Sequence, residues 1–510
     1  MRGLALVDIL VFAAYMAGVI LFGCSFYFRK GSRQAEAFTS GAGRLPAWAV
    51  GMSIFATFVS SISFLGLPAK AYTGNWNAFV FSLTIPVAAL MAVRFFVPLY
   101  RGLGSVSAYS YLETRFGPWA RVYASLCYLV TQVARMGTIM YLLALPMNAL
   151  LGWPVPAIIL VTGAGVLLYS TMGGIQAVIW TDAVQGIVLI AGTLLCLLVL
   201  LFSLPGGPGQ AWEIAAAADK FSLGSWSLKD WGSETFWVIF VYGVFINLQN
   251  YGIDQNYIQR YMTARSRRDA VSSTLFGSLL YVPVSFLFFA IGTALFAYYQ
   301  ARPDLLPPEA AARPDQIFPF FIVRGLPAGV TGLLIAAVFA AGMSTVSTSL
   351  NSGATILLED YYKRYADSDA DDARSLRVLR WGTLALAALG VGCALAMMRV
   401  KSALDAWWAM SSVFSGGMLG LFLLGYFAKK ARNAEAALGV ALGLLVIAWV
   451  CLLQKMWPLP VKIHTNLSIV LGTTVIFVAG FALAALRGRE VRGKPAARGS
   501  GRKREDNFGV

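Results

Sequence analysis

Long apolar segments recur along the whole chain, and their length constrains the fold more than any other feature of the sequence. A helix needs about 20 apolar residues to cross the hydrocarbon core of a bilayer. Thirteen runs of this kind cover roughly residues 5–27, 46–71, 77–100, 119–151, 154–171, 182–205, 234–257, 271–299, 325–358, 378–399, 404–427, 433–454 and 464–486. The sequence therefore predicts an all-α integral membrane protein with about 13 transmembrane helices, in a single domain over residues 1–487.

The basic residues predict how these helices are oriented. If the amino terminus lies outside, most Lys and Arg residues fall in connections on the cytoplasmic side, as the positive-inside rule expects. These connections lie near residues 29–44, 101–121, 260–268, 363–380 and 429–432. The pattern predicts a multi-pass protein of a cell membrane, such as a bacterial inner membrane, with its carboxyl terminus in the cytoplasm. Residues 488–510 are predicted to form a basic, disordered tail attracted to anionic membrane lipid.

The sequence contains no motif for several classes of function. The net charge of +16 lies mostly beside apolar runs, so it does not indicate a nucleic-acid partner. The five cysteines all fall within apolar runs without a CxxC pair, and no phosphate-binding loop, zinc-ligand or Ser/His/Asp pattern occurs. We therefore expect no enzyme activity, and no obligate protein partner is evident.

The ninth apolar run contains an unusual polar stripe over residues 341–352, in which seven of twelve side chains carry a hydroxyl or amide. An unpaired hydroxyl is costly in hydrocarbon. At about 100° per residue, one helix face carries Ala341, Ser344, Thr345 and Thr348, with Ser347 at its edge. Uncharged oxygens suit a hard monovalent cation. The alternative is helix packing by small residues, which is common in membranes.

Two charged residues interrupt apolar runs and are candidates for function. Arg135 lies in the middle of the fourth run, where its guanidinium could bind a solute carboxylate or pair with a carboxylate of another helix. Asp182 opens the sixth run, where it could stabilise the helix amino terminus or contribute to a cation site.

Polar residues also interrupt the second and seventh runs, around residues 53–66 and 247–255. Both helices are predicted to break there and to expose backbone carbonyls and helix ends to a solute. The two interruptions are five runs apart. This spacing suggests two inverted five-helix repeats, at about 46–205 and 234–427, with one extra amino-terminal helix and two extra carboxyl-terminal helices.

Together, three motifs resemble the sodium/solute symporter family. The first contains Gly173-Gly174, Trp180-Thr181-Asp182 and Gln185; the second contains Asp254-Gln255 and Gln259-Arg260-Tyr261; the third contains Ala340-Ala341, Ser344-Thr345 and Leu350-Asn351-Ser352. The resemblance implies a five-plus-five fold of the leucine-transporter type and Na⁺ as the coupling ion. It implies a main sodium site at Ala56, Val59, Ala341, Ser344 and Thr345. It also implies a second sodium site at Asp182, Ser344, Ser347 and Thr348.

The predicted solute pocket is most similar to that of the sialic-acid branch, chiefly because Arg135 matches a carboxylate-binding position. The resemblance implies solute contacts at Phe58, Ser60, Ser63, Phe79, Ser82, Arg135, Asn247 and Asn250, with Tyr251 as a gate residue. The chain departs from that branch at Ser82, where a glutamine is expected. We therefore predict sodium-coupled import of a small organic solute, such as a sugar acid, by alternating access. The alternatives are symport of a neutral sugar or another solute, and a transporter-like sensor.

Overall fold

The computed structural model describes residues 5–28, 34–311, 313–400, 403–454 and 462–493. Within these ranges the chain is helical throughout and forms no strand; an isolated bridge joins Leu45 to Ala264. The prediction of an all-α protein is confirmed.

Ten helical segments of the described chain are long and apolar enough to cross a membrane, or eleven if a bent pair counts as one crossing. The bent pair is α3 (Ala47–Phe58) and α4 (Ser61–Thr73). The ten are α1 (Leu6–Ser25), the run from η3 to α7 (Trp76–Leu103), α9 (Pro118–Leu151), α10 (Val155–Phe202), α12 (Phe236–Ile253), α14 (Arg267–Ala301), α17 (Val330–Ile356), α19 (Asp372–Met397), α21 (Asn433–Ala448) and α22 (Ser468–Gly493).

This number differs from the thirteen predicted runs for two identifiable reasons. The runs at 154–171 and 182–205 lie in one 48-residue helical element, α10, which Gly174 interrupts with φ 55° and ψ −152°. The run at 404–427 forms α20 (Ala403–Phe427). Several side chains of α20 lie outside the described residues, so only its part Gly416–Phe427 is recognised as apolar and α20 is not among the ten. At the carboxyl end, α22 continues six residues into the predicted tail, and residues 494–510 lie outside the described ranges.

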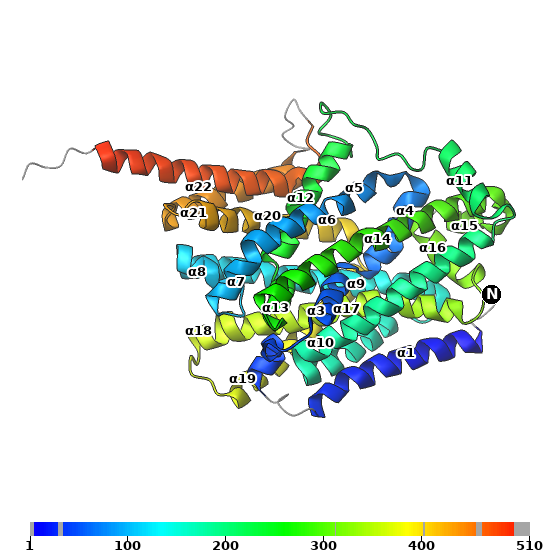
Figure 1. Ribbon diagram of the computed structural model, residues 1–510, viewed down its shortest axis with the longest axis horizontal. Coiled ribbons are helices and arrows are strands. Elements are labelled where there is room, and N and C mark those ends of the chain that lie inside the picture. The colour runs from blue at the N-terminus through cyan, green and yellow to red at the C-terminus, as the bar shows by residue number, and fades with distance from the viewer. Residues whose placement is uncertain (1–4, 29–33, 312, 401–402, 455–461, 494–510) are drawn as a thin grey trace, which may run out of the picture.

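The helices pack side by side into a bundle, with α1 along one edge and α21 and α22 along the opposite edge (Figure 1). α17 is the most enclosed of the candidate spans, with 89% of its most apolar window buried. It packs against α10, α9, α1 and α19. The polar stripe of α17 therefore lies inside the protein and does not face lipid.

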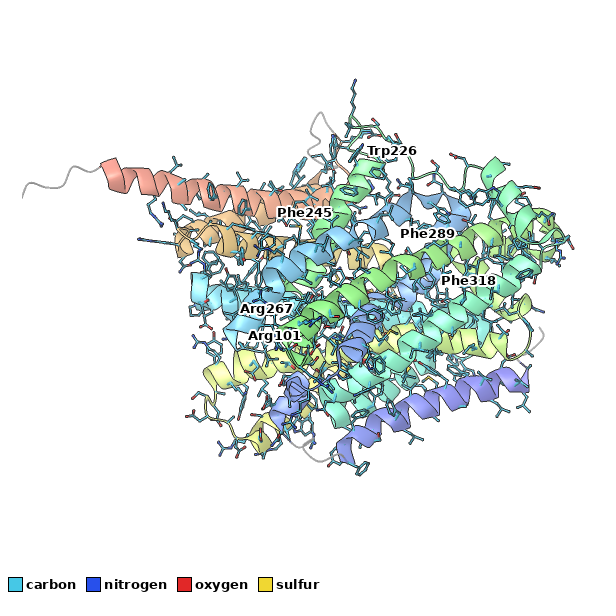
Figure 2. The ribbon with its side chains drawn as sticks, in the orientation of Figure 1. Arg101, Trp226, Phe245, Arg267, Phe289 and Phe318 are labelled. Carbon is cyan, nitrogen blue, oxygen red and sulfur yellow. The ribbon has the colours of Figure 1, made fainter. Side chains whose placement is uncertain are left out.

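Shorter helices lie between the spans: α2 (Ala35–Ser40), α8 (Ser110–Phe116), α11 (Gly207–Ala217), α13 (Gln255–Thr263), α15 (Pro308–Ala311), α16 (Pro314–Arg324) and α18 (Lys363–Tyr365). Trp226 lies at the margin of the fold and is exposed (Figure 2), whereas Phe289 of α14 and Phe318 of α16 are buried. Both long connections, at about 206–232 and 301–323, contain short helices.

Glycines allow α14 to approach the bent pair closely. A Cβ atom added to Gly277 would lie 2.3 Å from the carbonyl oxygen of Gly51 in α3. One added to Gly292 would lie 2.2 Å from the carbonyl oxygen of Pro68 in α4. Small residues at such contacts let helix backbones pack closely in membranes. Both halves of the bent pair are thus held against the same long helix.

Candidate functional site

The second and seventh predicted spans both break where polar residues interrupt them. α3 and α4 meet at an angle of 58°, and Val59 and Ser60 between them are extended. The Ser60 hydroxyl accepts a hydrogen bond from the amide of Ser63 at 3.4 Å and so caps α4. α12 ends at Ile253, and the extended residue Asp254 caps α13 in the same way. The two predicted breaks are confirmed.

The break in α3–α4 lies against the polar stripe of α17. The Ser344 hydroxyl lies 3.0 Å from the carbonyl oxygen of Ala56 and 3.2 Å from that of Ala341. The Thr345 hydroxyl lies 3.1 Å from the same Ala341 oxygen. Val59 is fully buried three residues after Ala56. Four of the five predicted sodium ligands are therefore connected by short oxygen–oxygen contacts, and the set consists of uncharged hard ligands.

A buried ion pair contacts α17 at Thr348, one turn after Ser344. Asp182 and Arg260 are both fully buried, and an Arg260 Nη2 lies 2.8 Å from Asp182 Oδ2. The Ser53 hydroxyl donates to the same carboxylate oxygen at 2.6 Å. Arg260 also donates to the Thr348 hydroxyl at 2.6 Å. Asp182 Oδ1 has no hydrogen-bond partner among the described residues.

The buried position of Arg260 contradicts its predicted place in a basic cytoplasmic connection near residues 260–268. The residue belongs to α13, whose residues are almost all buried. It carries the positive charge that a carboxylate inside the bundle requires. Asp182 itself was the available signal, because an isolated carboxylate in a membrane span calls for a cationic partner.

A cavity of about 270 Å³ opens beside the two broken helices. Five of the eight predicted solute residues line it: Phe58, Ser60, Ser63, Arg135 and Asn250. The guanidinium of Arg135 donates to the Thr57 carbonyl oxygen at 3.4 Å. It also interacts with the Tyr257 hydroxyl and, electrostatically, with the Asp254 carboxylate. The cavity is thus lined by one cation, one carboxylate, several hydroxyl and amide groups, and aromatic rings.

The remaining predicted solute residues do not line this cavity. Phe79 packs among aromatic rings, 5.4 Å from the ring of Phe289. The Ser82 hydroxyl contacts the hydroxyl of Ser285 at 2.7 Å. Asn247 is fully buried and donates to the Thr84 hydroxyl at 3.0 Å.

Tyr251, the predicted gate residue, is fully buried and stacks on Phe58, with the ring centroids 5.5 Å apart. Phe58 lines the cavity and Tyr251 does not, so Tyr251 packs against a residue of the cavity wall without lining the cavity itself.

Several polar and aromatic residues of the cavity were not predicted as solute contacts. They belong mainly to α9, α12 and the start of α13, and include Thr131, Gln132, Tyr242, Gln249, Asp254, Tyr257, Tyr281 and Ser411. Gln132 also accepts from the Ser349 hydroxyl at 2.7 Å, which connects the cavity wall to the stripe of α17. Thr131 and Gln132 lie within four residues of Arg135 in the sequence. This cluster of polar residues in an apolar run is the sequence feature that indicates α9 as a wall of the cavity.

The chain is similar to known proteins over most of its length. Residues 38–443 match the sodium:solute symporter family. The sodium/sialic acid symporter SiaT of Proteus mirabilis is 35% identical over 443 residues, which cover 86% of this chain and 88% of that protein. The sodium/sialic acid symporter NanT of Aliivibrio fischeri is 32% identical over 480 residues, which cover 93% of this chain and 92% of that protein.

The fold is also similar to a solved structure. A Na⁺-coupled sialic acid symporter in a substrate-bound, outward-open state superimposes with a TM-score of 0.87 at 31% sequence identity. The match covers 94% of this chain and 98% of the other. The helical arrangement is therefore that of a Na⁺-coupled transporter.

Proposed function

The chain belongs to the sodium:solute symporter family, and we propose that it couples inward sodium flow to the import of a sugar acid of the sialic-acid class. The observation that carries the proposed solute is the position of Arg135, whose guanidinium lines the cavity beside hydroxyl and amide groups. The similar proteins named as sialic acid symporters support the same solute class. A symporter moves its solute without covalent change, so no enzyme activity is part of the proposal.

Arg135 would bind the solute carboxylate. A guanidinium offers two parallel N–H donors that match the two carboxylate oxygens. The Asp254 carboxylate lines the same cavity and interacts electrostatically with Arg135. An incoming carboxylate would compete with Asp254 for the guanidinium, while Ser60, Ser63 and Asn250 offer partners for hydroxyl groups of a sugar acid.

The main sodium ion would bind between the end of α3 and the middle of α17. Its ligands would be the carbonyl oxygens of Ala56, Val59 and Ala341 and the hydroxyl oxygens of Ser344 and Thr345. The contacts of Ser344 with both Ala56 and Ala341 support this assignment, because they bring oxygens of two helices within ligand-sharing distance. Bound sodium would then join α3 to α17 in place of the hydrogen bond from Ser344 to Ala56.

A second sodium ion would bind at the carboxylate oxygen of Asp182 that Arg260 leaves free. Ser347 and Ser344 would contribute oxygens from α17, the helix that approaches Asp182 where Arg260 donates to both Asp182 and Thr348. The Thr348 hydroxyl accepts one hydrogen bond from Arg260 and has a second lone pair that could bind the ion. Arg260 also balances the charge of Asp182, and we expect the second site to bind sodium more weakly than the first.

Coupling follows from where the two ligands would bind. Sodium would hold α3 against α17, while the solute would contact α4 and α9 on the other side of the same 58° bend. Each ligand would therefore favour the same arrangement of the broken helix, which is the condition for positive coupling. A membrane potential of 100 mV supplies about 2.3 kcal/mol for each charge that enters.

We further propose thirteen membrane crossings in two inverted five-helix repeats with one extra helix before and two after them. A helix of 48 residues would be about 72 Å long, more than twice the thickness of the hydrocarbon core. The interruption at Gly174 therefore supports two crossings within α10. The basic connections support an external amino terminus and a cytoplasmic carboxyl terminus.

The binding experiment that tests the solute compares a sialic acid with its methyl ester, which lacks the negative charge. We expect the purified protein in sodium to be stabilised against heating by the acid and much less by the ester. Arg135→Gln should remove this difference. Equal stabilisation by acid and ester, or by a neutral hexose, would favour a neutral-sugar symporter and make Arg135 structural. Binding without any uptake would favour a sensor.

A further inference from the structure

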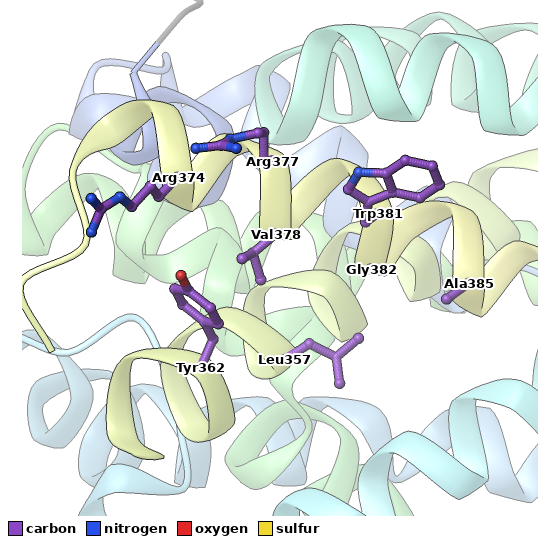
Figure 3. A pocket seen from close by; sticks show the side chains of 8 residues that line it. All are labelled: Leu357, Tyr362, Arg374, Arg377, Val378, Trp381, Gly382 and Ala385. Carbon is purple, nitrogen blue, oxygen red and sulfur yellow. The ribbon is translucent and has the colours of Figure 1, made fainter. Parts of the chain in front are cut away.

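A groove is lined by residues of α19 and of the segment that follows α17 (Figure 3), and none of these residues lines the solute cavity. Its volume is about 670 Å³. One wall is α19, and the other is η6 (Leu357–Tyr362), the segment that continues α17. The residues that matter for its chemistry are Leu357, Tyr362, Arg374, Arg377, Trp381 and Ala385.

The α19 wall changes from charged to apolar along its length. Arg374, Arg377, Trp381 and Ala385 follow one another at spacings of three or four residues, and thus share one helix face. Figure 3 shows the two arginines at one end of the groove and the Trp381 indole further along the same helix. Trp381 is 69% exposed and lies about 10 Å along the helix from Arg374.

The two arginines differ in their availability. Arg374 is paired with Asp367 at 2.9 Å. Arg377 is exposed, and within the described part of the chain it forms no hydrogen bond or ion pair. The neighbouring acidic residues are occupied elsewhere, because Asp371 caps α19 and Asp372 accepts from the amide of Ala35. Arg377 is therefore a free cation at the charged end of an apolar groove.

We propose that this groove binds one anionic phospholipid, with its phosphate at Arg377 and an acyl chain along Trp381, Ala385 and Leu357. An exposed indole beside basic residues is typical of the level of lipid headgroups. The groove walls beyond Arg377 are apolar, which a free phosphate would not require and an acyl chain would fill. The Tyr362 hydroxyl on the opposite wall offers a second donor near the headgroup.

The bound lipid would connect two functional elements. η6 continues directly from α17, which carries Ser344 and the rest of the polar stripe. α19 packs against α17 and η6. A lipid in the groove would contact both walls at once and stabilise the end of α17 relative to α19. The proposal does not depend on the identity of the solute.

Native mass spectrometry of the detergent-solubilised full chain tests the proposal. The protein is titrated with phosphatidylglycerol, with phosphatidylcholine of the same acyl chains, and with glycerol phosphate. We expect one tightly bound phosphatidylglycerol and weaker binding of the zwitterionic lipid. Arg377→Gln should weaken phosphatidylglycerol binding about fivefold, the effect of one basic residue near a lipid surface. Ala385→Phe should fill the apolar end and weaken binding of both lipids.

Arg268→Gln is the matched control, because it removes the same charge from an exposed position at the start of α14, outside the groove. Equal affinity for the two lipids, or equal losses in Arg377→Gln and Arg268→Gln, would overturn the proposal. Full displacement of the lipid by glycerol phosphate would show a site for phosphate alone and would overturn it as well. Sodium-dependent thermal stabilisation of each variant verifies that it is folded.

Discussion

The ion pair between Asp182 and Arg260 should be energetically coupled, and its removal should be costly. Arg260 is fully buried and donates to the Ser53 hydroxyl at 2.8 Å, the Asn256 carbonyl at 2.6 Å, the Asp182 carboxylate at 2.8 Å and the Thr348 hydroxyl at 2.6 Å. Arg260→Gln would leave the Asp182 carboxylate buried without its counter-charge. Removing one partner of a buried pair costs roughly 3–5 kcal/mol.

This cost can be expressed as a melting temperature. Unfolding entropy is about 2.1 cal/mol/K per residue, so a chain of 510 residues loses about 1 °C for each kcal/mol. We expect Arg260→Gln and Asp182→Asn each to melt about 3–5 °C below the wild type. The double variant contains no buried charge at this position and should lose about as much as either single variant.

The assay is tryptophan fluorescence during heating at a fixed rate, in detergent without sodium, because bound sodium would add its own stabilisation. Lys363→Gln is a control, since its pair with Glu359 is partly exposed and should contribute less than about 1 kcal/mol. If the double variant loses the sum of the two single losses, the two residues act independently and the reasoning is refuted.

Two further substitutions test the sodium site and the packing of the broken helix. Ser344→Ala removes the hydroxyl that contacts the Ala56 carbonyl. It should raise the sodium concentration for half-maximal uptake at least about tenfold, which corresponds to a loss of about 1.4 kcal/mol of binding free energy. An unchanged sodium concentration for half-maximal uptake would place the main site elsewhere. Gly292→Ala adds a methyl group 2.2 Å from the Pro68 carbonyl oxygen and should cost about 1–3 kcal/mol in thermal melting. Gly392→Ala meets nothing within 4 Å and should be neutral or stabilising, so equal melting of the two glycine variants would contradict the packing of α14 on α4.

The sequence predicts the helical character of the fold and its buried polar segments well because a membrane penalises polar groups strongly. The hydroxyls at residues 341–352 and the polar interruptions near Ser60 and Asn250 stand out against apolar neighbours. Each can be explained only by contacts inside the bundle. The structure places the stripe of α17 inside the protein and confirms both helix breaks.

The contents of the cavity are less predictable, because they depend on how distant segments pack. Arg260 lies in a polar stretch that resembles a surface connection, and its burial follows from contacts with α3, α10 and α17. Phe79 and Ser82 lie on a segment near the cavity but point toward α14. The sequence indicates which residues are polar, and the packing determines which of them line the cavity.

Uptake of a radiolabelled sialic acid into proteoliposomes tests the central claim most directly. An inward sodium gradient is compared with an equal gradient of potassium, at zero potential and at a negative internal potential. We predict accumulation above the external concentration only with sodium, and greater accumulation at the negative potential. Equal uptake in sodium and potassium, or sodium-driven uptake that Arg135→Gln leaves unchanged, would contradict the account.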